Sequence, residues 1–252
     1  MRTLGIDLAT VARKTAVCRI DWPDGAARPT VSLLQVGVVD HDIVAMAADV
    51  DVVAIDAPFG WPRPWAAAVG KHRPGSAFDA DGPPAMLTRR ETDVWIAKHI
   101  GIYPLAVAAN LIGATAIRCA RLVQSLRLPV DVGVSGPLPV VSEVYPAAAL
   151  ARWDMSYQLY KGKPYVEARR RLIAALVSAG LPVRLSAEHS GVVEASDDAL
   201  DALICSLVAR AVGLGLTDDA PESLLEAAAG EGWIRVPKKG ITLASLARGC
   251  RR

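Results

Sequence analysis

The sequence predicts an α/β domain in which helices flank a mixed sheet of five strands. Short apolar segments of strand length alternate along the chain with longer segments of helical period. Hydrophobic residues make up 52% of the 252 residues and charged residues 21%, a composition typical of a globular domain with a buried core. Two apolar segments, 4–9 and 52–58, each carry an aspartate where a buried strand ends. If these strands are parallel neighbours, both acids reach the sheet edge at which open α/β sheets bind ligands.

The first quarter of the chain predicts four strands and one short helix. Polar breaks and turn residues separate three strands that form a meander, and a helix leads to a fourth strand that can pair in parallel with the first. This order is typical of the opening of an RNase H-like sheet. The predicted strands are 2–9, 15–20, 30–39 and 52–56, and the helix is 42–48.

Residues 57–92 form an insertion of different composition after the fourth strand. Six prolines, several glycines and a group of basic residues predict a long irregular loop that leaves directly from Asp56. Long loops inside compact domains are usually functional or disordered. We therefore expect a lid or a substrate-contacting segment.

The remainder of the chain completes a single domain over residues 1–237. A helix over 104–126 precedes a fifth strand at 138–144, which carries Glu143. Further along, 165–179 and 196–214 are expected to be helical, 233–237 has the composition of another short strand, and 238–252 is a basic tail that ends with Arg248, Arg251 and Arg252.

The predicted helix over 196–214 is the most informative of these elements. Ser196 or Asp197 can cap its N-terminus, and its apolar residues follow a helical period. Asp198 and Asp201 lie three residues apart on one face, and Asp201 lies among apolar neighbours.

Charge and cysteine content exclude several classes of protein. A formal net charge of +2 provides no overall field that attracts a polyanion, so a nucleic-acid site would depend on local clusters. The four cysteines have no CxxC spacing, which argues against a zinc site and a disulfide framework and suits a reducing cytoplasm. Charged residues interrupt the longest apolar stretches, so we expect no membrane span and no export signal.

The acidic residues predict a shared site for Mg²⁺ or Mn²⁺. Hard cations take oxygen ligands, and two such ions can assist an in-line displacement at phosphorus. Each acid also has a structural explanation: the helix dipole for the pair in the 196–214 helix, a turn for Asp56, and an ion pair with an arginine for Glu143. Asp7 is the hardest to explain in that way, because it lies between Ile6 and Leu8 in a buried strand. The candidate catalytic residues are Asp7, Asp56, Glu143, Asp198 and Asp201, and all except Glu143 are candidate metal ligands.

Six segments resemble the domain-of-unknown-function 429 family, which is described as predicted nucleases with an RNase H fold. The resemblance extends over residues 2–237. The segments are LGIDLAT at 4–10, AIDAPFGWP at 54–62, RRETD at 89–93, SEVYPAAAL at 142–150, DDALDALICSLVARA at 197–211 and GWIRVP at 232–237.

The resemblance implies roles for several of these residues. Asp7 and Asp56 would be the metal ligands of the first and fourth strands, and Asp198 and Asp201 resemble the paired helix aspartates of RuvC-like resolvases. A glutamate on the fifth strand is not a standard RNase H position, so Glu143 is expected to act as an auxiliary acid.

The function predicted from these features is metal-dependent hydrolysis of DNA or RNA. Lys71, Arg73, Arg89 and Arg90 would contact the phosphate backbone, with an ion pair as the other interpretation of the two adjacent arginines. Trp61 and Trp65 could stack on bases or pack beneath the insertion.

Two other functions stay open. One is a phosphotransferase of the actin and sugar-kinase type, for which the segment 131–136 imitates a phosphate-binding Asp-x-Gly turn. The other is a nucleic-acid-binding protein without catalysis. The sequence also leaves the oligomeric state open, with a homodimer among the alternatives.

Overall fold

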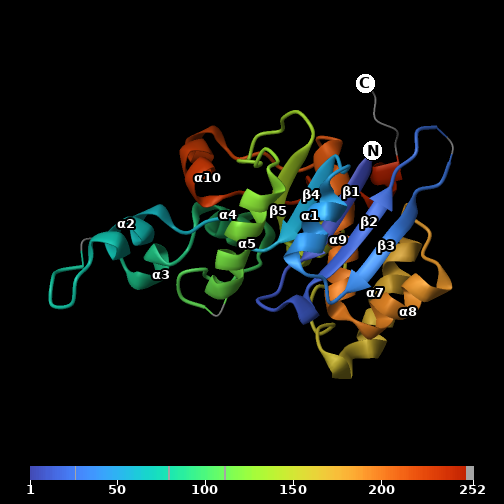
Figure 1. The fold of residues 1–252 in the computed structure, drawn as a ribbon, viewed down its shortest axis with the longest axis horizontal. Helices are drawn as coiled ribbons and strands as arrows, with labels where there is room; N and C mark the ends of the chain where they lie inside the picture. Colours follow the sequence, from blue (N-terminus) through green and yellow to red (C-terminus); the bar gives the residue numbers. More distant parts are fainter. Residues whose placement is uncertain (26, 79, 111, 248–252) are drawn as a thin grey trace.

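The computed structural model describes residues 1–25, 27–78, 80–110 and 112–247, and its centre is a mixed sheet of six strands (Figure 1). The strand order is β3-β2-β1-β4-β5-β6. The strands are β1 Arg2–Asp7, β2 Ala16–Asp21, β3 Thr30–Val36, β4 Val52–Asp56, β5 Val140–Val144 and β6 Ile234–Arg235.

The sheet has an antiparallel half and a parallel half that meet at β1. Strands β1, β2 and β3 pair as an antiparallel meander, and β1, β4, β5 and β6 are parallel. The predicted meander and the parallel pairing of the first and fourth strands are therefore confirmed. The predicted count of five strands is wrong, because residues 234–235 add a sixth strand beside β5.

Helices cover both faces of the sheet (Figure 1). On one face, α1 Asp40–Ala47 and α5 Gly113–Leu126 bury apolar side chains against Leu4, Ile6 and Ile55. The other face packs against α9 Asp197–Gly213, α7 Val166–Ser178 and α6 Pro146–Arg152, with α8 Ala187–Ala195 beside α7. Burial on both sides explains why the central strands are almost wholly apolar until they reach their aspartates.

Helix α9 lies directly against the backbone of β1. A Cβ atom added at Gly5 would come within 2.2 Å of the Ala202 carbonyl oxygen and the Ser206 amide nitrogen, so only glycine permits this approach. The Thr3 and Ser206 hydroxyls are 2.8 Å apart beside the same crossing. This contact sets the position of the α9 acids relative to β1.

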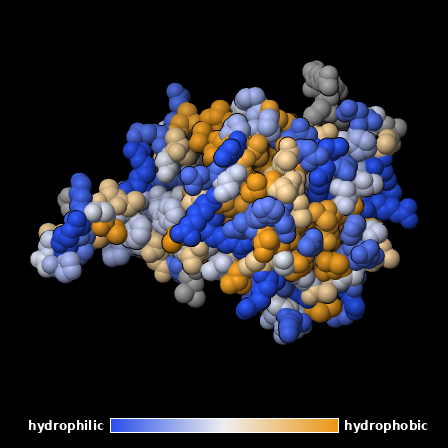
Figure 2. Space-filling model, in the orientation of Figure 1, coloured by the Kyte–Doolittle hydropathy of each residue, from blue (hydrophilic) through white to orange (hydrophobic). Residues whose placement is uncertain are grey.

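The insertion is less irregular than its composition predicts. Residues 57–90, here called the arm, contain α2 Arg63–Lys71 and the short α3 Pro84–Leu87, and the arm projects from the sheet (Figure 1). Pro64 lies in the first turn of α2 and Pro84 begins α3, positions where a helix tolerates proline. Figure 2 shows hydrophilic side chains gathered at the outer end of the arm.

Helix α10 Leu225–Glu231 anchors the arm through the side chain of Glu231. The Glu231 carboxylate accepts the Arg63 amide at 2.8 Å and the Glu91 amide at 2.8 Å, so it joins the start of α2 to the start of α4 Glu91–Ile100. Within the described residues, four short 3₁₀ helices complete the secondary structure, at Ala12–Lys14, Lys163–Tyr165, Glu222–Leu224 and Leu243–Ala247.

The helix predicted over 104–126 begins later, at Gly113. Residues 101–112 lack helical structure where they are described, and the Asn110 side chain accepts the Ala106 amide at 2.7 Å in a local turn. Arg248, Arg251 and Arg252 of the predicted basic tail lie outside the described residues. In the described part of the chain, no helix is long and apolar enough to cross a membrane.

Candidate functional site

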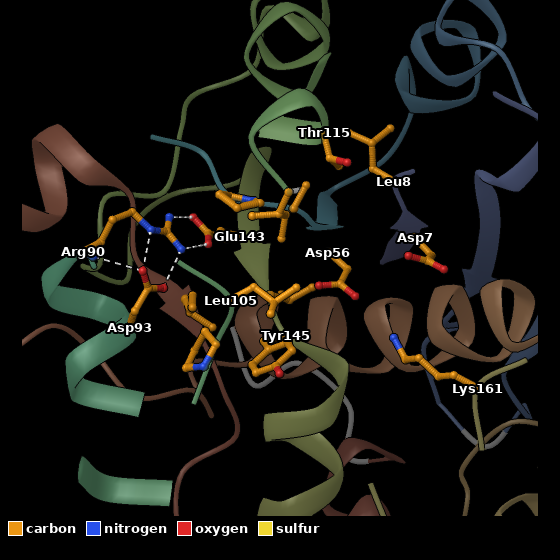
Figure 3. A pocket seen from close by; sticks show the side chains of 16 residues that line it. Asp7, Leu8, Asp56, Arg90, Asp93, Leu105, Thr115, Glu143, Tyr145 and Lys161 are labelled. Atoms are coloured by element: carbon orange, nitrogen blue, oxygen red, sulfur yellow. Dashed lines mark hydrogen bonds and ion pairs between the residues drawn. The ribbon is translucent and has the colours of Figure 1, made fainter. Parts of the chain in front are cut away.

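Two adjacent parallel strands deliver Asp7 and Asp56 to the same edge of the sheet. The two residues are partners in the β1–β4 register and each is the last residue of its strand. Both line one pocket of about 280 Å³ (Figure 3). The predicted convergence of these two carboxylates is therefore a property of the fold.

Asp201 joins this pair from α9. It is 1% exposed, and the Tyr160 hydroxyl donates to its Oδ1 atom at 2.6 Å. Asp201 is the strongest source of charge repulsion for Asp7, and it binds Lys161, which lines the pocket of Asp7 and Asp56, although Asp201 itself does not line that pocket. Three acids from three separate elements thus gather at one place.

Lys161 supplies a positive charge to these acids. Its Nζ atom lies 2.7 Å from Asp201 Oδ2, and the side chain lines the same pocket as Asp7 and Asp56. Figure 3 shows the ammonium group directed toward Asp56 and Asp7. Three carboxylates face one ammonium group, so negative charge is in excess when all three are ionised.

The excess of negative charge contributes to raised pKa values for Asp7 and Asp56. Burial, followed by repulsion from Asp201 and Asp56, raises the pKa of Asp7 well above its ordinary value. Burial also raises the pKa of Asp56 to about 7, where attraction by Lys161 opposes repulsion by Asp201. Burial lowers the pKa of Lys161, but attraction by Asp201 and Asp56 outweighs it and leaves that pKa raised.

Asp198 lies further out than Asp201. It is half-buried in the first turn of α9, and burial followed by repulsion from Asp197 and Asp201 raises its pKa. It does not line the pocket of Asp7 and Asp56. Ser196 caps α9, since its hydroxyl accepts the Ala199 amide at 3.2 Å, which confirms one of the two predicted caps.

Glu143 and Arg90 form a buried ion pair in the wall of the same pocket. Arg90 is 2% exposed, and its Nη1 and Nη2 atoms bind the two Glu143 oxygens at 2.8 and 2.7 Å. Asp93 completes the pair by accepting from Arg90 Nε and Nη2 (Figure 3). The ion pair that the sequence offered as the other interpretation of Arg90 and Glu143 is therefore present, while the phosphate contact of Arg90 and the auxiliary-acid role of Glu143 stay predictions.

The other predicted phosphate-binding residues lie on the arm. Lys71 and Arg73 are exposed at the end of α2 and just after it, whereas Arg89 is half-buried with its guanidinium 5.7 Å from the centre of the Tyr103 ring. Trp61, just before α2, and Trp65, within α2, are half-buried. None of these five residues lines the pocket of Asp7 and Asp56.

The carboxylates do not form a ready metal-binding group as they stand. Among the described residues, no three His, Cys, Asp or Glu side chains are placed to hold one ion. The chemistry of the donors is nevertheless that of a hard cation site, since all three are carboxylates and their mutual repulsion is unbalanced.

Sequence reasoning missed four residues that shape this site. They are Gly5, Tyr160, Lys161 and Arg169. The requirement that buried carboxylates have a cationic partner predicts a residue like Lys161, but more than a hundred residues separate it from Asp7 and Asp56 in the chain.

A family model described as a protein of unknown function, DUF429, matches residues 5–225. The chain belongs to this family. The DUF429 match includes both strand aspartates, Lys161 and all of α9, so the whole carboxylate site lies within the family region. No curated protein and no solved structure matches this DUF429 protein.

Proposed function

We propose that this DUF429 protein is a divalent-metal-dependent nuclease with an RNase H-like sheet. The observation that carries the proposal is the gathering of Asp7, Asp56 and Asp201 at the carboxyl end of adjacent parallel strands. The antiparallel meander, followed by a parallel partner of β1, supports the RNase H-like assignment.

Asp7, Asp56 and Asp201 would hold Mg²⁺ or Mn²⁺, with Asp198 as an outer acid. When bound, the ion would activate a water molecule and stabilise charge on the phosphate oxygens. The strands keep two of the carboxylates in register, and α9 presents the third from above β1. Lys71 and Arg73 on the arm would contact the nucleic-acid backbone, where basic side chains bind without reading sequence.

The phosphotransferase alternative depends on the turn at 131–136. The Asp131 carboxylate is 3% exposed and is bound by Arg235 Nε at 2.7 Å and by the Ser142 hydroxyl at 2.8 Å. A Cβ atom at Gly133 would lie 2.8 Å from Ala220 and 3.0 Å from Trp233. Protein groups therefore already bind the Asp131 carboxylate of this turn, which favours the nuclease.

We propose a cytoplasmic location as well. Cys18, Cys119 and Cys205 are buried free thiols, a state suited to a reducing compartment.

The deciding experiment is cleavage of fluorescent single-stranded, duplex, hybrid and branched nucleic acids in Mg²⁺ and in Mn²⁺. We expect metal-dependent cleavage by the wild type and a loss of roughly 100-fold or more in Asp7→Asn, because one ligand of the ion is then weakened. Asp42→Asn changes an exposed acid on α1 and should cleave like the wild type.

Binding of nucleic acid without cleavage in either metal would contradict the proposal and identify a binding protein. Cleavage that persists in Asp7→Asn would show that the reaction takes place elsewhere or comes from a contaminant.

A further inference from the structure

The Lys161 ammonium group binds a carboxylate oxygen that could otherwise act as a metal ligand. Both carboxylate oxygens of Asp201 have partners: Tyr160 donates to Oδ1 and Lys161 binds Oδ2. An ion brought to Oδ2 of Asp201 would lie beside the Lys161 ammonium group and be repelled by it, so a divalent ion competes with Lys161 for this carboxylate. The same ammonium group lines the pocket of Asp7 and Asp56.

The backbone that carries Lys161 is held on both sides. Arg169 Nη1 donates to the carbonyl oxygens of Tyr160 and Gly162, both at 2.8 Å, and Arg169 Nε donates to the Glu194 carbonyl at 2.8 Å. Arg169 is fully buried, so these bonds attach the loop to the end of α8, beside the start of α9. Movement of Lys161 is thereby confined to its side chain.

That side chain is able to leave. Its relative exposure is 56%, whereas that of its partner Asp201 is 1%. A lysine stem has four rotatable carbons and its ammonium group is strongly hydrated, so water can receive the charge without unfolding the loop.

We propose that Lys161 is a tethered counter-ion that takes the cation position beside Asp7, Asp56 and Asp201 in the metal-free protein, and that a divalent ion must displace it. This inference rests on the proposed function. It makes Lys161 a positioning residue that sets the metal affinity of the site and keeps the carboxylates together before the metal arrives. A permanent ion pair would instead keep Lys161 on Asp201 whether or not metal is bound.

The first measurement is Mn²⁺ binding to metal-stripped protein by titration calorimetry at one fixed pH. Lys161→Met keeps the apolar stem and removes the charge. If the ammonium group occupies the site in about 90% of metal-free molecules, removing it tightens apparent binding about tenfold. Lys163→Met, two residues away on the same exposed segment, should bind like the wild type.

The second measurement is amine acylation of the wild-type protein with and without Mg²⁺, read residue by residue by mass spectrometry. Displacement predicts that labelling of Lys161 rises when Mg²⁺ is added while labelling of Lys163 stays constant. This second measurement requires no substitution, so it decides the question even if Lys161→Met fails to fold.

The outcomes separate this inference from the proposed function. Metal binding by the wild type with unchanged Lys161 labelling overturns displacement and leaves the nuclease proposal standing, even if Lys161→Met binds more tightly through lost repulsion. Equal Mn²⁺ affinity in the wild type and Lys161→Met also overturns it. No Mn²⁺ binding by either protein overturns both proposals.

Discussion

At the scale of single residues, burial and repulsion between neighbouring carboxylates raise the pKa values of Asp7 and Asp56. Asp56 is the clearest case, because burial and its acidic neighbour Asp201 raise its pKa to about 7 from an ordinary 3.8. Between those two values the folded state binds more protons than the unfolded state. The stability of the metal-free protein should therefore be greatest near the lower value and fall as the pH rises through the higher one.

Asp56→Asn tests this linkage. Because the substitution removes the charge, we expect the metal-free variant to exceed the wild type in stability at pH 8 by on the order of 2 kcal/mol, and the difference to shrink toward pH 5. Urea unfolding in EDTA at several pH values measures it, with Asp42→Asn as the control. If the stability of the wild type does not change between pH 5 and pH 8, the pKa of Asp56 is not raised in the folded protein.

Arg90 gives a second prediction at this scale. Arg90→Met leaves Asp93 and Glu143 buried without a counter-charge, which should lower the free energy of unfolding by about 3–5 kcal/mol. The neighbouring change Arg89→Met, at a half-buried position, should cost less than about 1 kcal/mol. Equal effects of the two substitutions in urea unfolding would refute a structural role specific to Arg90.

At the scale of elements, the contact of α9 with β1 builds the site. The two elements touch at backbone level at Gly5, and the same helix presents Asp201 one residue before Ala202, whose carbonyl faces Gly5. A change in the separation of helix and strand therefore moves Asp201 relative to Asp7.

Gly5→Ala should separate α9 from β1. The added methyl group has no space, so we expect a loss of about 1–3 kcal/mol or more of unfolding free energy. Mn²⁺ affinity should fall in the same variant, as calorimetry would show. Gly191→Ala on α8 meets no atom within 4 Å and should be neutral or stabilising. If Gly5→Ala is as stable as the wild type, the packing of α9 against β1 does not depend on the close approach at Gly5.

At the scale of the whole molecule, the two ends of the arm form part of the wall of the carboxylate pocket, at Ala57, Pro58 and Arg90, and buried charges fix them there. Glu231 binds the amides at the start of α2 and of α4, and the Arg90 network links the C-terminal end of the arm to β5. The basic residues near the end of α2 lie away from this anchor and are exposed. We therefore expect these basic residues to contribute to nucleic-acid binding and not to the stability of the fold.

The double variant Lys71→Ala/Arg73→Ala should weaken nucleic-acid binding about tenfold and reduce the slope of log affinity against log salt by roughly 2. Thermal stability should stay unchanged. Arg170→Ala/Arg171→Ala removes the same charge from α7, away from the arm, and serves as the control in fluorescence anisotropy. If both double variants lose nucleic-acid affinity equally, the effect comes from the lower net charge of the protein and not from a binding surface on the arm.

Much of the framework is predictable from local sequence. The apolar runs before Asp7 and Asp56 and the cap at Ser196 locate two strands and one helix, because each signal lies within a few residues of the element it defines. Strand β6 lies within 233–237, which was predicted as a further short strand, but helices α4 and α6 escaped prediction. Their segments are short and mixed in composition, and packing against neighbouring elements stabilises them more than local preference does.

The sequence by itself determined that two aspartates end neighbouring buried strands and that a third lies on an apolar helix. Periodicity and strand order carry that information. Only the tertiary structure decided which charges meet: Arg90 binds Glu143 and Asp93, while Lys161 reaches Asp201 beside Asp7 and Asp56. Electrostatic partners depend on distance in space, and burial makes each pairing strong, whereas the positions of these residues in the chain do not reveal that they are neighbours.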